Sequence, residues 1–209
     1  MSKSNIGAAV AIVGTLGAGA MDLHAEEIIA VGSGNTYSID PATGSGSLIG
    51  PLGTFSGLNA MAKDSSGTLW AMSSDDLVIV DPDTGQAFFV VEVKNRVNSV
   101  RGMAWHRGEL YLIQDGGSTS DPDELWIVDV ATGDSTLIGE MNFRNLQGAA
   151  SDGETFYAWS IFDGLVTVDT STGICTDVDS AVFADNDIQT IAFDSSGQLY
   201  GARNSLCTI

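Results

Sequence analysis

Short apolar runs alternate with turn residues along most of this chain. Each run is four to six residues long, as in Ser47–Gly50, Thr136–Gly139 and Thr190–Phe193. This length suits a β-strand and is too short for a helix. No segment after the N-terminus keeps the 3.6-residue period of an amphipathic helix. The pattern therefore predicts an all-β protein.

The turns between these runs recur at a regular spacing. An Asp-x-x-Thr-Gly sequence occurs four times, starting at Asp40, Asp81, Asp129 and Asp169. A period of about 40–50 residues is typical of repeat architectures. An Asp that opens a turn accepts hydrogen bonds from backbone amides two residues on, and the closing Gly supplies the positive φ that a hairpin requires. We therefore expect hairpin turns here rather than metal sites.

Other elements recur in phase with this turn. A Gly-x-Leu-aromatic sequence occurs at Gly67–Trp70, Gly108–Tyr111 and Gly197–Tyr200, and a copy with one added residue ends at Tyr157. Each unit thus holds four short strands in about 43 residues, the content of one blade of a β-propeller. We expect the repeated aromatic rings to pack between neighbouring blades. The predicted blades cover residues 28–50, 57–92, 98–140, 145–178 and 188–209.

The repeated unit resembles those of a known group of proteins. Its elements Gly-x-Leu-Tyr-Ala, Ile-Asp-Pro-Ala-Thr-Gly and Leu-Ile-Gly are similar to the repeats of secreted bacterial propellers of the quinoprotein-like and YVTN-like group. The resemblance implies a β-propeller and says little about activity, since many members are domains of unknown function. Quinoprotein dehydrogenases of the group hold their cofactor with extra residues that have no counterpart here, so we expect no cofactor.

The two ends of the repeat region predict an incomplete ring of four to five blades. The first blade begins at its second strand, Ile28–Val31, and the last stops after its third, Leu206–Ile209. Folded proteins avoid open strand edges, so we expect the chain to be part of a longer propeller. The alternative is a four-bladed ring in which Ile188–Phe193 pairs with the first blade.

The N-terminus predicts a signal peptide over residues 1–25. Lys3 precedes the apolar run Ile6–Ala20, and Ala18–Ala20 offers a small-x-small cleavage site, with cleavage after Ala25 as the other option. The run is shorter than the roughly 20 residues that span a bilayer, although a single anchor is the alternative. We expect a secreted, periplasmic or cell-surface protein with no stable membrane insertion after signal removal.

The charge of the chain limits the kinds of partner it can bind, and its two cysteines raise the question of a disulfide. Asp and Glu number 27 against 8 Lys and Arg, for a net charge of −19. Such a surface repels phosphates, so we expect no nucleic acid partner. Export permits a disulfide between Cys175 and Cys207, while two buried free thiols are the favoured alternative.

The repeats differ from one another at one end of the predicted blades. There lie the loops between second and third strands and the crossovers between blades, and variable loops on a rigid scaffold commonly carry binding groups. The loop Gln114–Glu124 is expanded, and the crossover before it is basic. We expect a ligand-binding face here, or else charges that simply pair locally. The candidate residues are Lys94, Arg96, Arg101, Asp115, Asp185 and Asp187.

The expanded loop also suggests a calcium site. Asp121, Asp123 and Glu124 offer the hard oxygen ligands that calcium takes. The spacing lacks the order of an EF-hand loop, and Pro122 stiffens the segment.

No catalytic motif is present in the sequence. His106 stands beside Arg107 and Gly108 in a tight turn, where we expect a solvated side chain. The first strand of each blade is expected to line the central channel, and its side chains are small and apolar. This disfavours a polar catalytic site in the channel. The function predicted is a non-catalytic exported module that binds a protein, glycan or surface polymer. The alternatives are a metal-assisted, lactonase-like hydrolase or lyase at the channel mouth, and a structural module of a larger cell-surface protein.

Overall fold

The apolar runs form β-strands throughout. The computed structural model describes residues 9–13, 27–41, 43–95, 98–118, 120–178, 188–194, 196–202 and 206–208. Every regular element in these ranges is a strand. Accordingly, they contain no helix of the length and apolarity needed to cross a membrane.

The strands form five antiparallel sheets, each ordered as in the chain. Blade 1 is β1 Ala9–Val13, β2 Glu27–Gly32, β3 Asn35–Ile39 and β4 Gly46–Pro51. Blade 2 is β5 Ala60–Lys63, β6 Leu69–Ser73, β7 Asp76–Val80 and β8 Ala87–Glu92. Blade 3 is β9 Val100–His106, β10 Glu109–Gln114, β11 Glu124–Val128 and β12 Ser135–Glu140. Blade 4 is β13 Leu146–Ser151, β14 Phe156–Ser160, β15 Gly164–Val168 and β16 Cys175–Asp177. Blade 5 has the described strands β17 Thr190–Phe193, β18 Leu199–Ala202 and β19 Leu206–Thr208.

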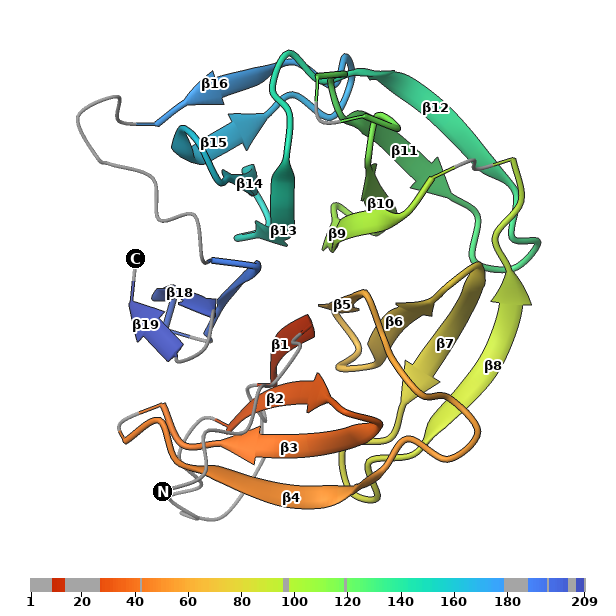
Figure 1. The fold of residues 1–209 in the computed structure, drawn as a ribbon, viewed down its shortest axis with the longest axis vertical. Coiled ribbons are helices and arrows are strands. Elements are labelled where there is room, and N and C mark those ends of the chain that lie inside the picture. The colour runs from red at the N-terminus through yellow and green to blue at the C-terminus, as the bar shows by residue number, and fades with distance from the viewer. Residues whose placement is uncertain are drawn as a thin grey trace.

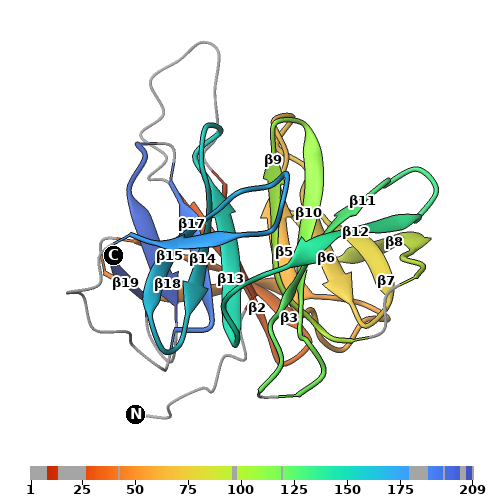
Figure 2. The same ribbon diagram turned by 90° about the horizontal axis from the view of Figure 1, so that it is seen from above.

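The sheets are arranged radially about a common axis (Figure 1). The first strands β1, β5, β9, β13 and β17 lie innermost, and each contacts the next around the circle, with β17 beside β1. Seen from the side, inner strands such as β9 and β13 stand roughly along the axis (Figure 2). The predicted all-β propeller of four-stranded antiparallel blades is confirmed, with four complete blades and a fifth sheet of three described strands.

The core consists of one apolar cluster between each pair of neighbouring sheets. In β6, Leu69 and Ala71 pack toward blade 1, whereas Trp70 and Met72 pack toward blade 3. This follows from strand geometry, because successive side chains point to opposite faces. The repeated aromatics Trp70, Tyr111, Tyr157 and Tyr200 all lie in these inter-blade clusters, as predicted.

The Asp-x-x-Thr-Gly sequences form the predicted hairpin turns. In blade 3, the Asp129 carboxylate accepts a hydrogen bond from the Ala131 amide at 2.9 Å, and Gly133 has a φ of +74°. Asp81 and Asp169 accept the equivalent bond at the same distance. These bonds to the charged form hold the pKa of Asp81, Asp129 and Asp169 below the usual value.

The same turns also connect neighbouring blades. The hydroxyl of Thr36 in blade 1 donates to the carbonyl of Gly85 in blade 2 at 2.8 Å. A Cβ on Gly133 of blade 3 would lie 2.0 Å from the carbonyl oxygen of Glu92 in blade 2. Blades 3 and 4 meet in the same way, since a Cβ on Gly139 would lie 2.3 Å from the Thr172 carbonyl oxygen. We call this contact of a turn with the preceding blade's outer strand the blade lock.

The expectations for the first blade and for the ring need correction. Blade 1 was expected to begin without a first strand, but Ala9–Val13 pairs antiparallel with β2 in that position. Five apolar residues satisfy a signal peptide and an inner strand equally well, so apolarity alone did not distinguish them. The pairing expected in the four-bladed alternative is not observed, because β17 pairs with β18 rather than with blade 1. The inner strands of all five sheets close the circle, and the fifth sheet has three described strands. Cleavage of a signal peptide at residues 20–25 stays a prediction.

Cys175 is a free, buried cysteine. Burial raises the pKa of its thiol to about 12, so the reactive thiolate is suppressed. The side chain of Cys207 lies outside the described residues.

Candidate ligand-binding site

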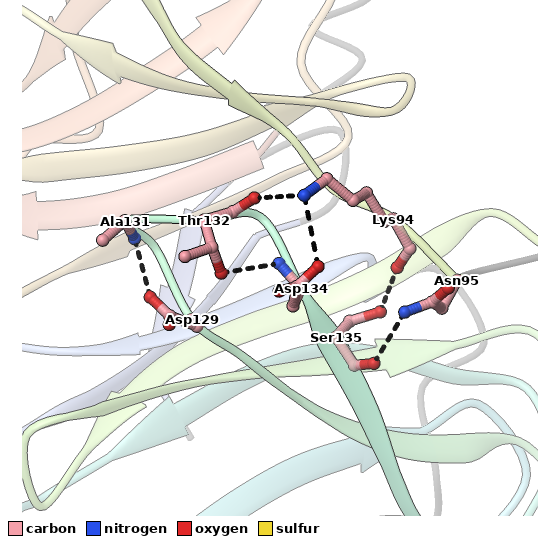
Figure 3. Close-up of polar contacts among 7 residues, drawn as sticks. All are labelled: Lys94, Asn95, Asp129, Ala131, Thr132, Asp134 and Ser135. Atoms are coloured by element: carbon pink, nitrogen blue, oxygen red, sulfur yellow. Dashed lines mark hydrogen bonds and ion pairs between the residues drawn. The ribbon is translucent and has the colours of Figure 1, made fainter.

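Lys94 lies in the blade lock between blades 2 and 3 (Figure 3). Its ammonium group donates to the Thr132 carbonyl at 2.8 Å and lies 3.2 Å from the Asp134 carboxylate. Its own carbonyl accepts from the Ser135 hydroxyl. Lys94 thus stabilises the contact between blades 2 and 3.

Arg101 lies on the inner strand β9 and is paired differently. Its guanidinium makes a two-nitrogen ion pair with Asp115, whose carboxylate also accepts the Gly117 amide at 3.0 Å. The pair holds the pKa of Asp115 below its usual value. Lys94 and Arg101 therefore have separate partners within the protein, and ligand binding by them stays a prediction. Arg96, Asp185 and Asp187 lie outside the described residues.

The three predicted calcium ligands are placed in different surroundings. Asp121 is exposed, Asp123 is buried, and Glu124 accepts hydrogen bonds from Gln114 and Trp126 at 3.1 and 3.0 Å. Within the described ranges, no group of three or more His, Cys, Asp or Glu side chains is placed to hold a metal ion. Calcium binding stays a prediction, for which calorimetry with calcium is the direct test.

Asp123 instead joins the expanded loop of blade 3 to the crossover into blade 4. Its carboxylate accepts the Leu146 amide at 2.6 Å and the Gly116 amide at 3.4 Å. Its backbone bonds to Phe143 and Met141 on the same crossover. Burial raises the pKa of Asp123 to about 6 in spite of these amides. Asp123 therefore fixes the relative position of two variable segments.

An open groove of about 570 Å³ lies at this junction. Its walls come from the expanded loop, the crossover into blade 4 and the β14–β15 turn. All three belong to the end of the blades that the sequence predicted to carry a ligand. The lining residues are Ser120, Pro122, Asn142, Phe143, Arg144, Phe162 and Asp163. We call it the blade 3–4 groove.

Hydrogen bonds to the scaffold hold each wall of the groove in place. The fully buried Ser160 hydroxyl donates to Asp163 at 2.8 Å and accepts the Asp163 amide at 3.1 Å, which fixes the β14–β15 turn. The amide of Asn142 is bonded on both sides to the Cys175 backbone, at 2.6 and 3.1 Å. The groove is thus formed by loops whose backbones are anchored.

Arg144 and Phe162 are the exposed large side chains of this groove. Phe162 is 56% exposed, and the Arg144 guanidinium carbon lies 5.7 Å from the centre of its ring. Among the described residues, Arg144 has no hydrogen-bond or ion-pair partner. Binding sites commonly combine an aromatic face, which contacts apolar groups, with an arginine, which donates hydrogen bonds to an anion.

The central channel offers a smaller space. A cavity of about 110 Å³ is lined mainly by apolar side chains of the inner strands, both small and large, with Lys63 and Ser151 as its polar members. Ser151 is hydrogen-bonded to His106 at 2.8 Å. The expectation of a solvated His106 is wrong, because this side chain is 3% exposed and packs against Tyr111 and Phe156. Burial and Arg107 lower the pKa of His106.

The groove lies at the end of the blades where the sequence predicts a ligand-binding face, but its residues Arg144 and Phe162 are not among the predicted ones. Phe162 occupies a tight turn, where a large apolar side chain is unusual, and this was the available signal. Arg144 is an isolated cation in a crossover, and only the three-dimensional structure shows that it has no oxygen partner among the described residues.

Comparison with known proteins defines the fold class. No family profile and no curated protein sequence matches the chain. A Bacteroides thetaiotaomicron protein of unknown function superposes with a TM-score of 0.61 at 15% identity, over 86% of this chain and 55% of its own. This chain thus spans about half of that protein's length.

Enzymes share the fold as well. Glutaminyl cyclase from Myxococcus xanthus matches with a TM-score of 0.62 at 13% identity, over 98% of this chain and 90% of its own. A gluconolactonase from Xanthomonas campestris matches with 0.57 at 15%, over 86% and 67%. An extracellular domain of a B. thetaiotaomicron two-component system and a PQQ-bound aldose sugar dehydrogenase from Streptomyces coelicolor are also similar. At such identities the likeness shows the fold alone: the protein is a β-propeller.

Proposed function

We propose that this protein is an exported, non-catalytic binding module that takes a protein or glycan ligand in the blade 3–4 groove. The observation that carries the proposal is the pair formed by the exposed Phe162 ring and Arg144 over an open groove of about 570 Å³. Rigid aromatic and Arg side chains dominate the energetics of many binding sites. Anchored walls support this role, because a preformed site loses less entropy on binding.

Export is part of the same proposal. It is supported by extracellular propellers among the structural neighbours. The pattern of residues 1–25 fits a signal peptide, although Ala9–Val13 fits the inner strand β1 equally well. The net charge of −19 disfavours a nucleic acid ligand.

Arrayed glycans and arrayed peptides, probed with the full chain, test the binding role. Each hit is measured again with Phe162→Ser and with the control Phe89→Ser, since Phe89 on β8 is equally exposed at 57%. We expect Phe162→Ser to weaken binding at least about tenfold and Phe89→Ser to leave it unchanged. Hits that ignore Phe162→Ser contradict the groove, and a complete lack of hits contradicts the binding role.

The competing hydrolase or lyase is tested on the same preparation. Aryl esters and lactones are offered with and without divalent cations, and we expect no turnover. Turnover that a chelator abolishes would favour the metal-assisted enzyme instead.

A further inference from the structure

We infer that the blade 3–4 groove binds the free carboxylate of a peptide C-terminus whose last side chain is apolar. This inference rests on the proposed function and specifies its ligand. It follows from three features of the groove: one available guanidinium, apolar walls beside it, and few groups left to bind sugar hydroxyls.

The guanidinium of Arg144 selects for an anion. The other described arginines donate to oxygen acceptors: Arg101 pairs with Asp115, and Arg107 donates to the Glu154 carbonyl at 3.0 Å. Arg144 has a ring for its neighbour and no oxygen partner in the described part of the chain. The planar fork of a guanidinium matches a carboxylate with two parallel hydrogen bonds.

The walls of the groove select for an apolar group next to that carboxylate. Pro122, Phe143 and Phe162 line it from three separate segments. A C-terminal residue carries its carboxylate and its side chain on one carbon, so both fit within a single groove of this size. An aromatic or aliphatic side chain would bury area against Phe162 and Phe143.

Polyanions and neutral sugars fit less well. The chain carries a net charge of −19, which repels a polymer with many negative groups, while one guanidinium suits a single negative charge. Sugar recognition needs amides and carboxylates for the hydroxyl groups, but part of the capacity of Asn142 and Asp163 is already used in bonds to Cys175 and Ser160. The net charge of −19 favours a partner that is otherwise neutral or basic.

Two small probes separate the carboxylate from the rest of the ligand. N-acetyl-L-phenylalanine and N-acetyl-L-phenylalaninamide differ only in that group, and D-glucuronate represents an acidic sugar. Each is titrated into the ¹⁵N-labelled full chain while the backbone amide signals of Ser120, Asp121 and Asp123 and of residues 142–146 and 161–164 are followed. We expect a dissociation constant of about 1 mM for the acid and at least tenfold weaker binding of the amide.

Variants of Arg144 provide the second readout. Arg144→Gln should abolish the preference for the acid over the amide, while Arg144→Lys should keep part of it, because the charge remains and the planar fork does not. Phe89→Ser, the exposed control on β8, should leave the preference intact.

Equal binding of acid and amide by the wild type would overturn the inference, and so would tighter binding of D-glucuronate. If the probes fail while an arrayed glycan binds in a Phe162-dependent way, the peptide ligand is wrong and the binding role stands. If nothing depends on Phe162, both are wrong.

Discussion

Two crossovers of this propeller each carry a cation, and the surroundings of the two differ. Lys94 follows β8 and reaches a carbonyl and a carboxylate of the next blade. Arg144 follows β12 and reaches only an aromatic ring within the described residues. A cation beside a regular turn thus finds backbone oxygens and stabilises the scaffold. A cation in a groove between irregular loops stays available for a ligand.

The blade lock belongs to the scaffold side of this comparison, and substitutions at its glycines should have the largest effect on the free energy of unfolding. Gly133→Ala should lower the free energy of unfolding by at least about 3 kcal/mol, because a Cβ there would collide with the Glu92 carbonyl. Gly44→Ala is the control, since Gly44 also has a positive φ but no neighbour within 4 Å. Its cost should be about 1 kcal/mol. Denaturant unfolding measures both, and equal costs would show that the lock adds nothing beyond backbone strain.

The groove should depend on Asp123 for its shape. Asp123→Ala leaves the Leu146 and Gly116 amides without their acceptor, which should cost about 2 kcal/mol at pH 7. The amide signals of residues 141–146 should broaden or shift, and the affinity for N-acetyl-L-phenylalanine should fall. An unchanged affinity would show that the groove holds its shape without this carboxylate.

The pH dependence of that cost follows from the raised pKa. Asp123 titrates near pH 6 in the folded protein and near 3.8 when unfolded, so the folded state binds the proton more tightly between these values. Its stabilising contribution is therefore largest below about pH 4 and declines as pH rises through 6. The difference in unfolding free energy between wild type and Asp123→Ala should thus be greater at pH 4 than at pH 7, by on the order of 2 kcal/mol. A difference that shrinks on acidification would contradict the raised pKa.

Lys94 should show the smallest effect. Its side chain is 53% exposed, and exposed ion pairs contribute little, so Lys94→Met should cost less than about 1 kcal/mol. The cost should shrink further in high salt. Loss of ligand binding in this variant would place Lys94 in the binding site, as the sequence first suggested.

Much of the fold was predictable because its determinants are local and repeated. Each determinant acts within one blade or at one junction between blades, as the turns at Asp81, Asp129 and Asp169 and the ring of Trp70 do. Their regular spacing along the chain therefore predicts the propeller architecture. The strand at Ala9–Val13 was not predictable, since its composition fits two roles that differ only in what lies beside it.

The sequence indicates the variable end of the blades, but not which residues form the groove found there. The variable end of the blades follows from strand order alone. Arg144 and Phe162 come into contact because Asp123 and Ser160 fix the irregular segments that carry them. A periodic sequence pattern does not predict contacts between irregular segments. His106 was mistaken for a solvated residue because its hydrogen-bond partner, Ser151, lies on another blade.

The blade lock has a consequence for how such a chain can grow. At the junctions between blades 1 and 2, 2 and 3, and 3 and 4, one blade contributes the turn and the other the receiving outer strand, so the contact is head-to-tail. A tandem copy of such a unit would already match its neighbours on both flanks. Duplication of a unit can therefore lengthen the circle, and loss of a unit can shorten it, without the need for a new complementary surface. Identical subunits assemble into rings on the same principle.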